Sequence, residues 1–69
     1  MLNQMKKIDS QKVRDRIRDL ELKQYWVAQE AGVHKTTLRR WLNGRIARVK
    51  PENVKRLAIV LSTEAPNLF

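Results

Sequence analysis

The stretch that decides the fold covers residues 24–44 and reads QYWVAQEAGVHKTTLRRWLNG. Apolar side chains recur at helical spacing on either side of Gly32, which predicts short helices over residues 24–31 and 35–43. We expect Gly32 to adopt a left-handed conformation in the turn, because a residue without Cβ avoids the steric strain there. Two short helices joined by such a turn describe a helix-turn-helix.

Helices are also predicted on both sides of this stretch. Asp9 is a good N-cap for a first helix over residues 10–20, in which the apolar stripe is Val13, Ile17 and Leu20. Charged residues three apart on its other face suggest two ion pairs, Asp15 with Arg18 and Arg16 with Asp19. Pro51 and Glu52 suit the start of a fourth helix, which would bury Val54, Leu57, Ala58 and Leu61.

The rest of the chain shows no strand pattern, and residues 45–50 are expected to form a basic loop. Residues 62–69 have room for one or two helical turns. The sequence therefore predicts an all-α fold, a compact bundle of four to five helices. Residues 1–9 would form a short N-terminal arm, and residues 10–69 the helix-turn-helix domain.

Charge is concentrated in one part of the chain. The 69 residues carry 15 Lys and Arg against 7 Asp and Glu, a formal net charge of +8. Seven of these net charges fall within residues 34–56. This concentration favours a phosphate-bearing partner over a surface that is basic by chance.

Composition narrows the possible functions further. The chain has no Cys and one His, which argues against a disulfide framework, a thiolate metal site or a bound cofactor. No convergent catalytic set is present, so an enzyme is not expected. No apolar run is long enough for a membrane span, and we expect a cytoplasmic protein, associated with the nucleoid when it is bound to DNA.

The central stretch resembles a known family. Gln24, Ala28, Gly32, Leu38 and Trp41 stand in the register of the lambda-repressor-like, Cro-type helix-turn-helix proteins, the XRE class. The likeness covers roughly residues 10–69. It implies a compact bundle of five helices that binds double-stranded DNA.

One departure from the family pattern makes a structural prediction. Many members pair an Arg in the first helix with a Glu just after the Trp position, whereas this sequence has Ile17 and Leu42 there. Replacing both partners of a buried ion pair by apolar groups is often neutral or stabilising. We therefore expect Ile17 and Leu42 to contact each other.

The resemblance also implies which residues meet DNA. The third helix would enter the major groove, and its outward positions are the candidate base contacts: His34, Lys35, Thr36, Arg39 and Arg40. Lys35 and Arg40 suit the O6 and N7 acceptors of guanine, and His34 stands where the family commonly has a better helix cap. The candidate contacts to the DNA backbone are Gln24, Tyr25, Asn43, Arg45, Arg48 and Lys50.

The leading interpretation is a sequence-specific DNA-binding protein, a small Cro- or repressor-type transcriptional regulator of a phage or mobile element, bound to DNA as a homodimer. The alternatives are a DNA-binding antitoxin, an excision or architectural factor, and a basic module that binds an acidic protein. RNA binding is disfavoured because residues 34–40 contain no Phe, Tyr or Trp on which bases could stack. Leu68 and Phe69 could form the dimer contact or cover the core.

Overall fold

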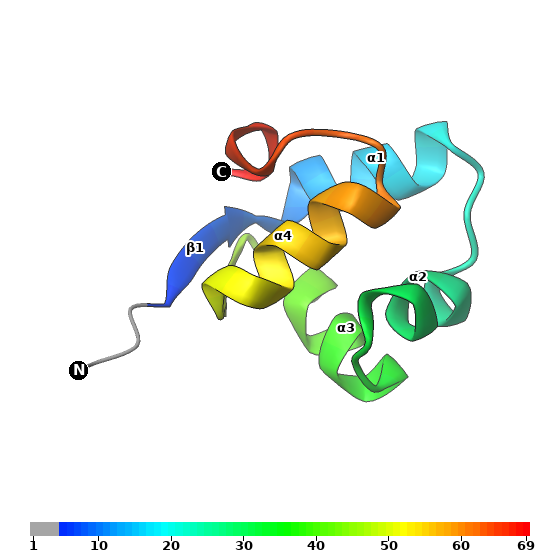
Figure 1. Ribbon diagram of the computed structural model, residues 1–69, viewed down its shortest axis with the longest axis horizontal. Helices are drawn as coiled ribbons and strands as arrows, with labels where there is room; N and C mark the ends of the chain where they lie inside the picture. Colours follow the sequence, from blue (N-terminus) through cyan, green and yellow to red (C-terminus); the bar gives the residue numbers. More distant parts are fainter. Residues whose placement is uncertain (1–4) are drawn as a thin grey trace.

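The computed structural model describes residues 5–69, and Figure 1 shows their arrangement. In chain order the elements are β1 (Lys6–Asp9), α1 (Ser10–Asp19), α2 (Gln24–Ala31), α3 (Lys35–Leu42), β2 (Ile46–Val49), α4 (Pro51–Val60) and a short 3-10 helix, η1 (Ala65–Leu68). The predicted helices are present, and their predicted ends agree to within one residue. Asp9 caps α1 as expected, because its carboxylate accepts hydrogen bonds from the amides of Gln11 and Lys12.

The all-α prediction is wrong in one respect, because the fold contains a small antiparallel sheet. β2 lies within residues 45–50, which were predicted to be a loop, and it pairs with β1. β1 lies within the segment predicted to be an N-terminal arm. Ile8 and Ala47 face each other across this two-stranded ribbon, and both are buried. Burial of this pair ties the ribbon to the helical core.

The core is enclosed by the four α-helices and the ribbon, with α2 packed against both α3 and α4. In Figure 1, α1 runs along the top of the molecule, α3 lies along the bottom, and α4 crosses in front. Side chains from the helices, the ribbon and η1 form one cluster: Ile8, Val13, Ile17, Val27, Ala28, Leu38, Trp41, Leu42, Ala47, Val49, Val54, Leu57, Ala58, Leu61 and Leu68. Ile17 and Leu42 both belong to it, and their direct contact stays a prediction. Leu20 was predicted to be buried but is exposed, because it caps the end of α1.

The first turn of α1 holds the end of α3. The Ser10 hydroxyl is fully buried and donates a hydrogen bond of 2.6 Å to the Trp41 carbonyl. The Arg14 guanidinium donates to the carbonyls of Leu42 and Gly44. The last carbonyls of a helix have no partner within the helix, so these bonds satisfy acceptors that would otherwise be unpaired.

Arg16 makes a similar connection to the end of α4. Its guanidinium donates to the carbonyls of Leu61 and Ser62, at 2.7 and 2.8 Å. The predicted ion pair of Arg16 with Asp19 is therefore replaced by bonds to backbone oxygens. The predicted pair of Arg18 with Asp15 is present, at 3.4 Å.

Replacing Ser10 by alanine would leave the buried Trp41 carbonyl without its donor. We expect Ser10→Ala to lower the free energy of unfolding by about 1–3 kcal/mol, measured by urea unfolding followed by circular dichroism. Ser62→Ala is the matched control, because Ser62 is the chain's other serine and is exposed. We expect it to change the unfolding free energy by less than about 0.5 kcal/mol. Equal losses in the two variants would contradict this role for Ser10.

Candidate nucleic-acid interface

α2, the turn and α3 form the predicted helix-turn-helix. α2 ends at Gly32, which has φ 75°, the left-handed conformation that was expected. The amides of Gly32 and Val33 donate to the carbonyls of Gln29 and Ala28, which closes the turn. Ala28 is buried as predicted. The turn between the two helices is therefore closed by two backbone hydrogen bonds and a left-handed glycine.

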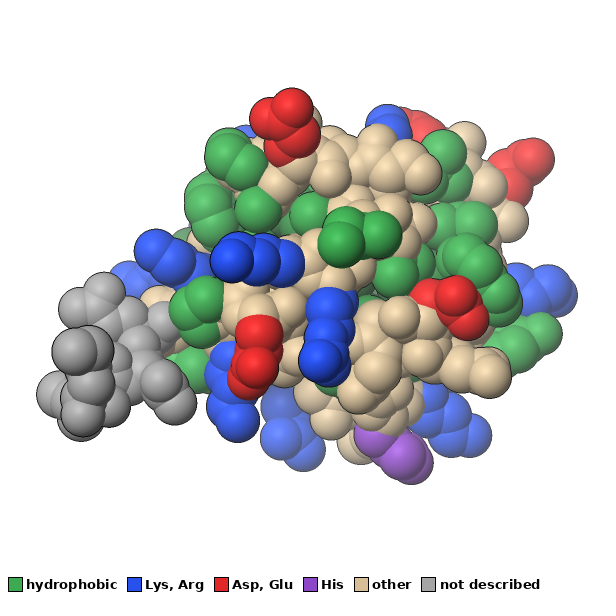
Figure 2. Space-filling model, viewed as in Figure 1, with side chains coloured by type: hydrophobic (Ala, Val, Ile, Leu, Met, Phe, Trp, Pro, Cys, Tyr) green, Lys and Arg blue, Asp and Glu red, His purple; other side chains and the backbone are tan. Residues whose placement is uncertain are grey.

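The orientation of α3 follows from its buried side. Leu38, Trp41 and Leu42 lie in the core, Thr37 is half-buried, and the other side chains of the helix face outward. Four of the five candidate base contacts lie on this exposed side: Lys35, Thr36, Arg39 and Arg40. Figure 2 shows blue Lys and Arg side chains and the purple His along the lower edge of the molecule, where Figure 1 places α3. The core thus presents a basic helix to a partner in one fixed orientation.

His34 is the fifth candidate, and it is the N-cap of α3. Its Nδ1 accepts a hydrogen bond of 3.1 Å from the amide of Thr36. An accepting Nδ1 carries no proton, so the ring proton lies on Nε2. His34 is exposed, so this Nε2–H can donate to a base or a phosphate. His34 therefore caps α3, although histidine is a poorer cap than serine or threonine, and it also offers a hydrogen-bond donor at the start of the helix.

The cations of this surface have no carboxylate partner in the part of the chain that the structure describes. The ion pairs formed within residues 5–69 both involve Arg18, which lies on α1. Lys35, Arg39 and Arg40 are exposed, and none of them forms an ion pair within residues 5–69. Such charges release their counterions when they bind phosphates, which favours association with nucleic acid.

The candidate backbone contacts at the start of α2 are also accessible. Gln24 and Tyr25 are exposed, and Tyr25 has 61% of its surface accessible. Lys23, the N-cap, makes no side-chain hydrogen bond to the helix. The first amides of α2 therefore have no capping side chain, and a helix start of this kind suits a phosphate.

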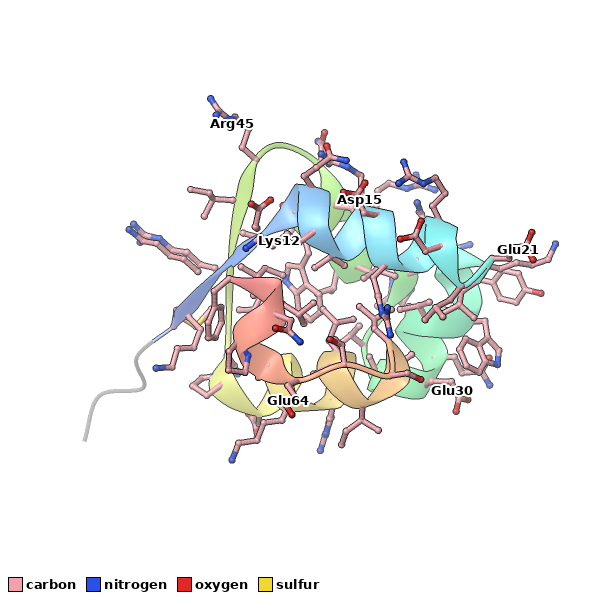
Figure 3. The ribbon with its side chains drawn as sticks, turned by 90° about the horizontal axis from the view of Figure 1, so that it is seen from above. Lys12, Asp15, Glu21, Glu30, Arg45 and Glu64 are labelled. Atoms are coloured by element: carbon pink, nitrogen blue, oxygen red, sulfur yellow. The ribbon has the colours of Figure 1, made fainter. Side chains whose placement is uncertain are left out.

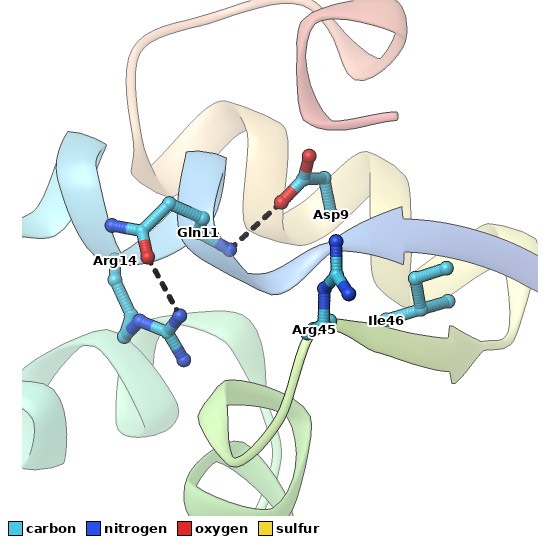
Figure 4. Close-up of a pocket in the computed structure, with 5 residues that line it drawn as sticks. All are labelled: Asp9, Gln11, Arg14, Arg45 and Ile46. Atoms are coloured by element: carbon cyan, nitrogen blue, oxygen red, sulfur yellow. Dashed lines mark hydrogen bonds between the residues drawn. The ribbon is translucent and has the colours of Figure 1, made fainter.

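The remaining backbone candidates follow α3. Asn43, Arg45, Arg48 and Lys50 are all exposed. Arg45 projects from the turn before β2, away from the body of the molecule (Figure 3). It shares an open hollow with Asp9, Gln11, Arg14 and Ile46 (Figure 4). Arg14 is engaged there, because it donates to Gln11 as well as to backbone carbonyls, whereas no ion pair or side-chain hydrogen bond within residues 5–69 holds Arg45.

Sequence reasoning missed the residues that position this surface. Ser10 and Arg14 hold the end of α3 through bonds to residues 28–31 positions away. It also missed Lys7, which the ribbon brings opposite Arg48. A serine or arginine in a helix carries no local signal for such distant partners.

No group of three or more His, Cys, Asp or Glu that could hold a metal ion occurs within residues 5–69. No helix in the same range is long and apolar enough to cross a membrane.

Comparison with known proteins identifies the family. A family model described as a helix-turn-helix domain matches residues 12–68, which is most of the chain. The protein therefore belongs to this helix-turn-helix family, which is XRE/Cro-like. None of the curated proteins matches the sequence. The resemblance seen in residues 24–44 is thus confirmed over nearly the whole domain.

The capping role of His34 can be tested by substitution. His34→Ala removes the acceptor for the Thr36 amide, and we expect it to lower the free energy of unfolding by about 0.5–2 kcal/mol. His34→Ser supplies another acceptor at the same position and should restore most of that loss. The measurement is thermal or urea unfolding of the wild type and both variants. A serine variant that is no more stable than the alanine variant would contradict the cap.

Proposed function

We propose that this protein is a sequence-specific double-stranded DNA-binding protein, a small regulator of the Cro or repressor type. The helix-turn-helix family supports DNA as its partner. In this motif the second helix lies in the major groove, and its N-terminal residues meet the base edges. A regulator of this kind would act in the cytoplasm, on the nucleoid.

The observation that carries the proposal is the exposed side of α3. It bears three cations without carboxylate partners among residues 5–69, next to the Nε2–H of His34. Lys35 and Arg40 would read guanine, because their donors match its O6 and N7 acceptors. Arg39 would contact a base or a phosphate, and Thr36 a thymine methyl group.

Backbone contacts would fix the position of α3 on the duplex. Contacts to phosphates set the register and orientation of a protein on DNA and carry no sequence information themselves. Gln24 and Tyr25 would supply them from the start of α2. The segment after α3 would supply the others, through Asn43, Arg45, Arg48 and Lys50.

We also propose that two copies bind together. Helix-turn-helix dimers bind half-sites about 34 Å apart, one turn of the duplex. Leu68 is buried in its own core, so of the two terminal apolar residues Phe69 is the one available to a partner. A palindromic binding site would be the expected sequence signature of such a dimer.

DNA binding can be tested by band-shift titration over a range of salt concentrations. We expect a specific duplex to be shifted, with log K falling linearly against log salt by about 0.9 for each phosphate contacted. The controls are an RNA of the same sequence and an acidic protein as competitors. The proposal fails if no genomic fragment is shifted at low salt, or if the acidic protein is bound in preference to the duplex.

Two arginine variants separate base reading from backbone contact. We expect Arg40→Ala to cost about 1–3 kcal/mol on the preferred site and to relax the preference at one base pair. Arg45→Ala should instead weaken binding to all sequences alike and reduce the salt slope by about 1. The measurement is titration against duplexes that each differ from the preferred site at one base pair. A uniform loss in Arg40→Ala would show that Arg40 reads no base.

A further inference from the structure

The antiparallel ribbon places Lys7 directly opposite Arg48. Side chains alternate between the two faces of a strand. The neighbouring pair, Ile8 and Ala47, is buried against the core, so Lys7 and Arg48 occupy the outer face, where both are exposed. Residues opposite each other in such a pair have Cβ atoms about 5 Å apart. The ribbon therefore holds two positive charges side by side on its outer surface.

This arrangement is unfavourable in the protein alone. Like charges that are directly opposite in an antiparallel pair destabilise it. The carboxylate of Asp9 is the nearest in sequence to Lys7, and it is engaged with the first amides of α1. Within residues 5–69 neither Lys7 nor Arg48 forms an ion pair. An anion bound to this face would remove the repulsion that the free ribbon carries.

The position of the ribbon indicates which anion this is. In Figures 1 and 3 the ribbon lies at one end of the molecule and α2 at the other, with α3 between them. β2 begins four residues after α3 ends, and the Ser10 amide donates to the Arg45 carbonyl just before it. The ribbon therefore lies beside the end of α3 and is joined to α1 at its base. A helix that lies in a groove has a phosphate backbone on either side, and α2 can meet one of the two.

We propose that the outer face of the ribbon binds the phosphate backbone on the side of the groove away from α2, with Lys7 and Arg48 as the contacting side chains. This inference rests on the proposed function, because it requires α3 to lie in the major groove. It adds Lys7 to the DNA-binding surface and makes β1 part of that surface. The pairing of β1 with β2 would bring two residues that are 41 positions apart in the sequence to one stretch of phosphates.

The test is the salt dependence of binding to the preferred duplex for Lys7→Gln, Arg48→Gln and the double variant. We expect the log–log slope to fall by about 0.9 in each single variant and by about twice that in the double variant. Discrimination against a duplex with one base pair changed should stay as in the wild type. The melting temperature of the free protein should be unchanged or higher, because the variants remove a repulsion. Lys7→Arg and Arg48→Lys keep the charge and should keep the slope.

Arg18→Gln is the matched control. It removes an exposed arginine near the C-terminal end of α1, the end that does not contact α3 through Ser10 or Arg14, and it should leave the slope unchanged. The ribbon proposal is overturned if specific binding persists and the glutamine variants keep the wild-type slope. It is also overturned if Arg18→Gln lowers the slope equally, because the effect would then be one of total charge. Loss of duplex binding by the wild type itself would instead overturn the proposed function.

Discussion

The contact between α1 and the end of α3 centres on one buried hydrogen bond, from the Ser10 hydroxyl to the Trp41 carbonyl. Ser10 is the one polar residue among those described that is fully buried, and a buried polar group is costly unless it is paired. This bond fixes the first turn of α1 against the end of α3. The Ser10 amide binds Arg45 in the same region, and Arg14 binds the carbonyls of Leu42 and Gly44. One end of α1 thus sets the positions of α3, the turn after it and the start of β2.

This connection explains how so small a domain can present a defined surface. A chain of 69 residues has a small core, and helices of eight residues are not stable by themselves. α3 is held by its buried side chains and by donors from α1 at its last carbonyls, while His34 holds its first turn. Its cations can then lie exposed and unpaired without destabilising the helix. The buried side of α3 holds the helix in place, and the opposite side can therefore carry exposed positive charges.

The helices could be predicted from the sequence because the residues that mark a helix lie within it or next to its ends. Asp9, Gly32 and Pro51 mark helix ends, and the spacing of apolar residues marks the buried sides. The ribbon was missed because its strands are four residues long and pair across 37 or more residues. The outward positions on α3 could be predicted, since they follow from the buried ones. The roles of Ser10, Arg14 and Arg16 could not, because each acts on a carbonyl that is distant in the chain.

We propose that α3, held in place by α1, presents its exposed basic side to the major groove. The most direct test is an NMR titration of the labelled protein with a duplex selected from random DNA. We expect the largest amide shifts in residues 34–40, with further shifts at the start of α2 and in the ribbon. The exposed side of α1 should change little. Largest shifts on the exposed side of α1 would contradict this placement of the binding surface.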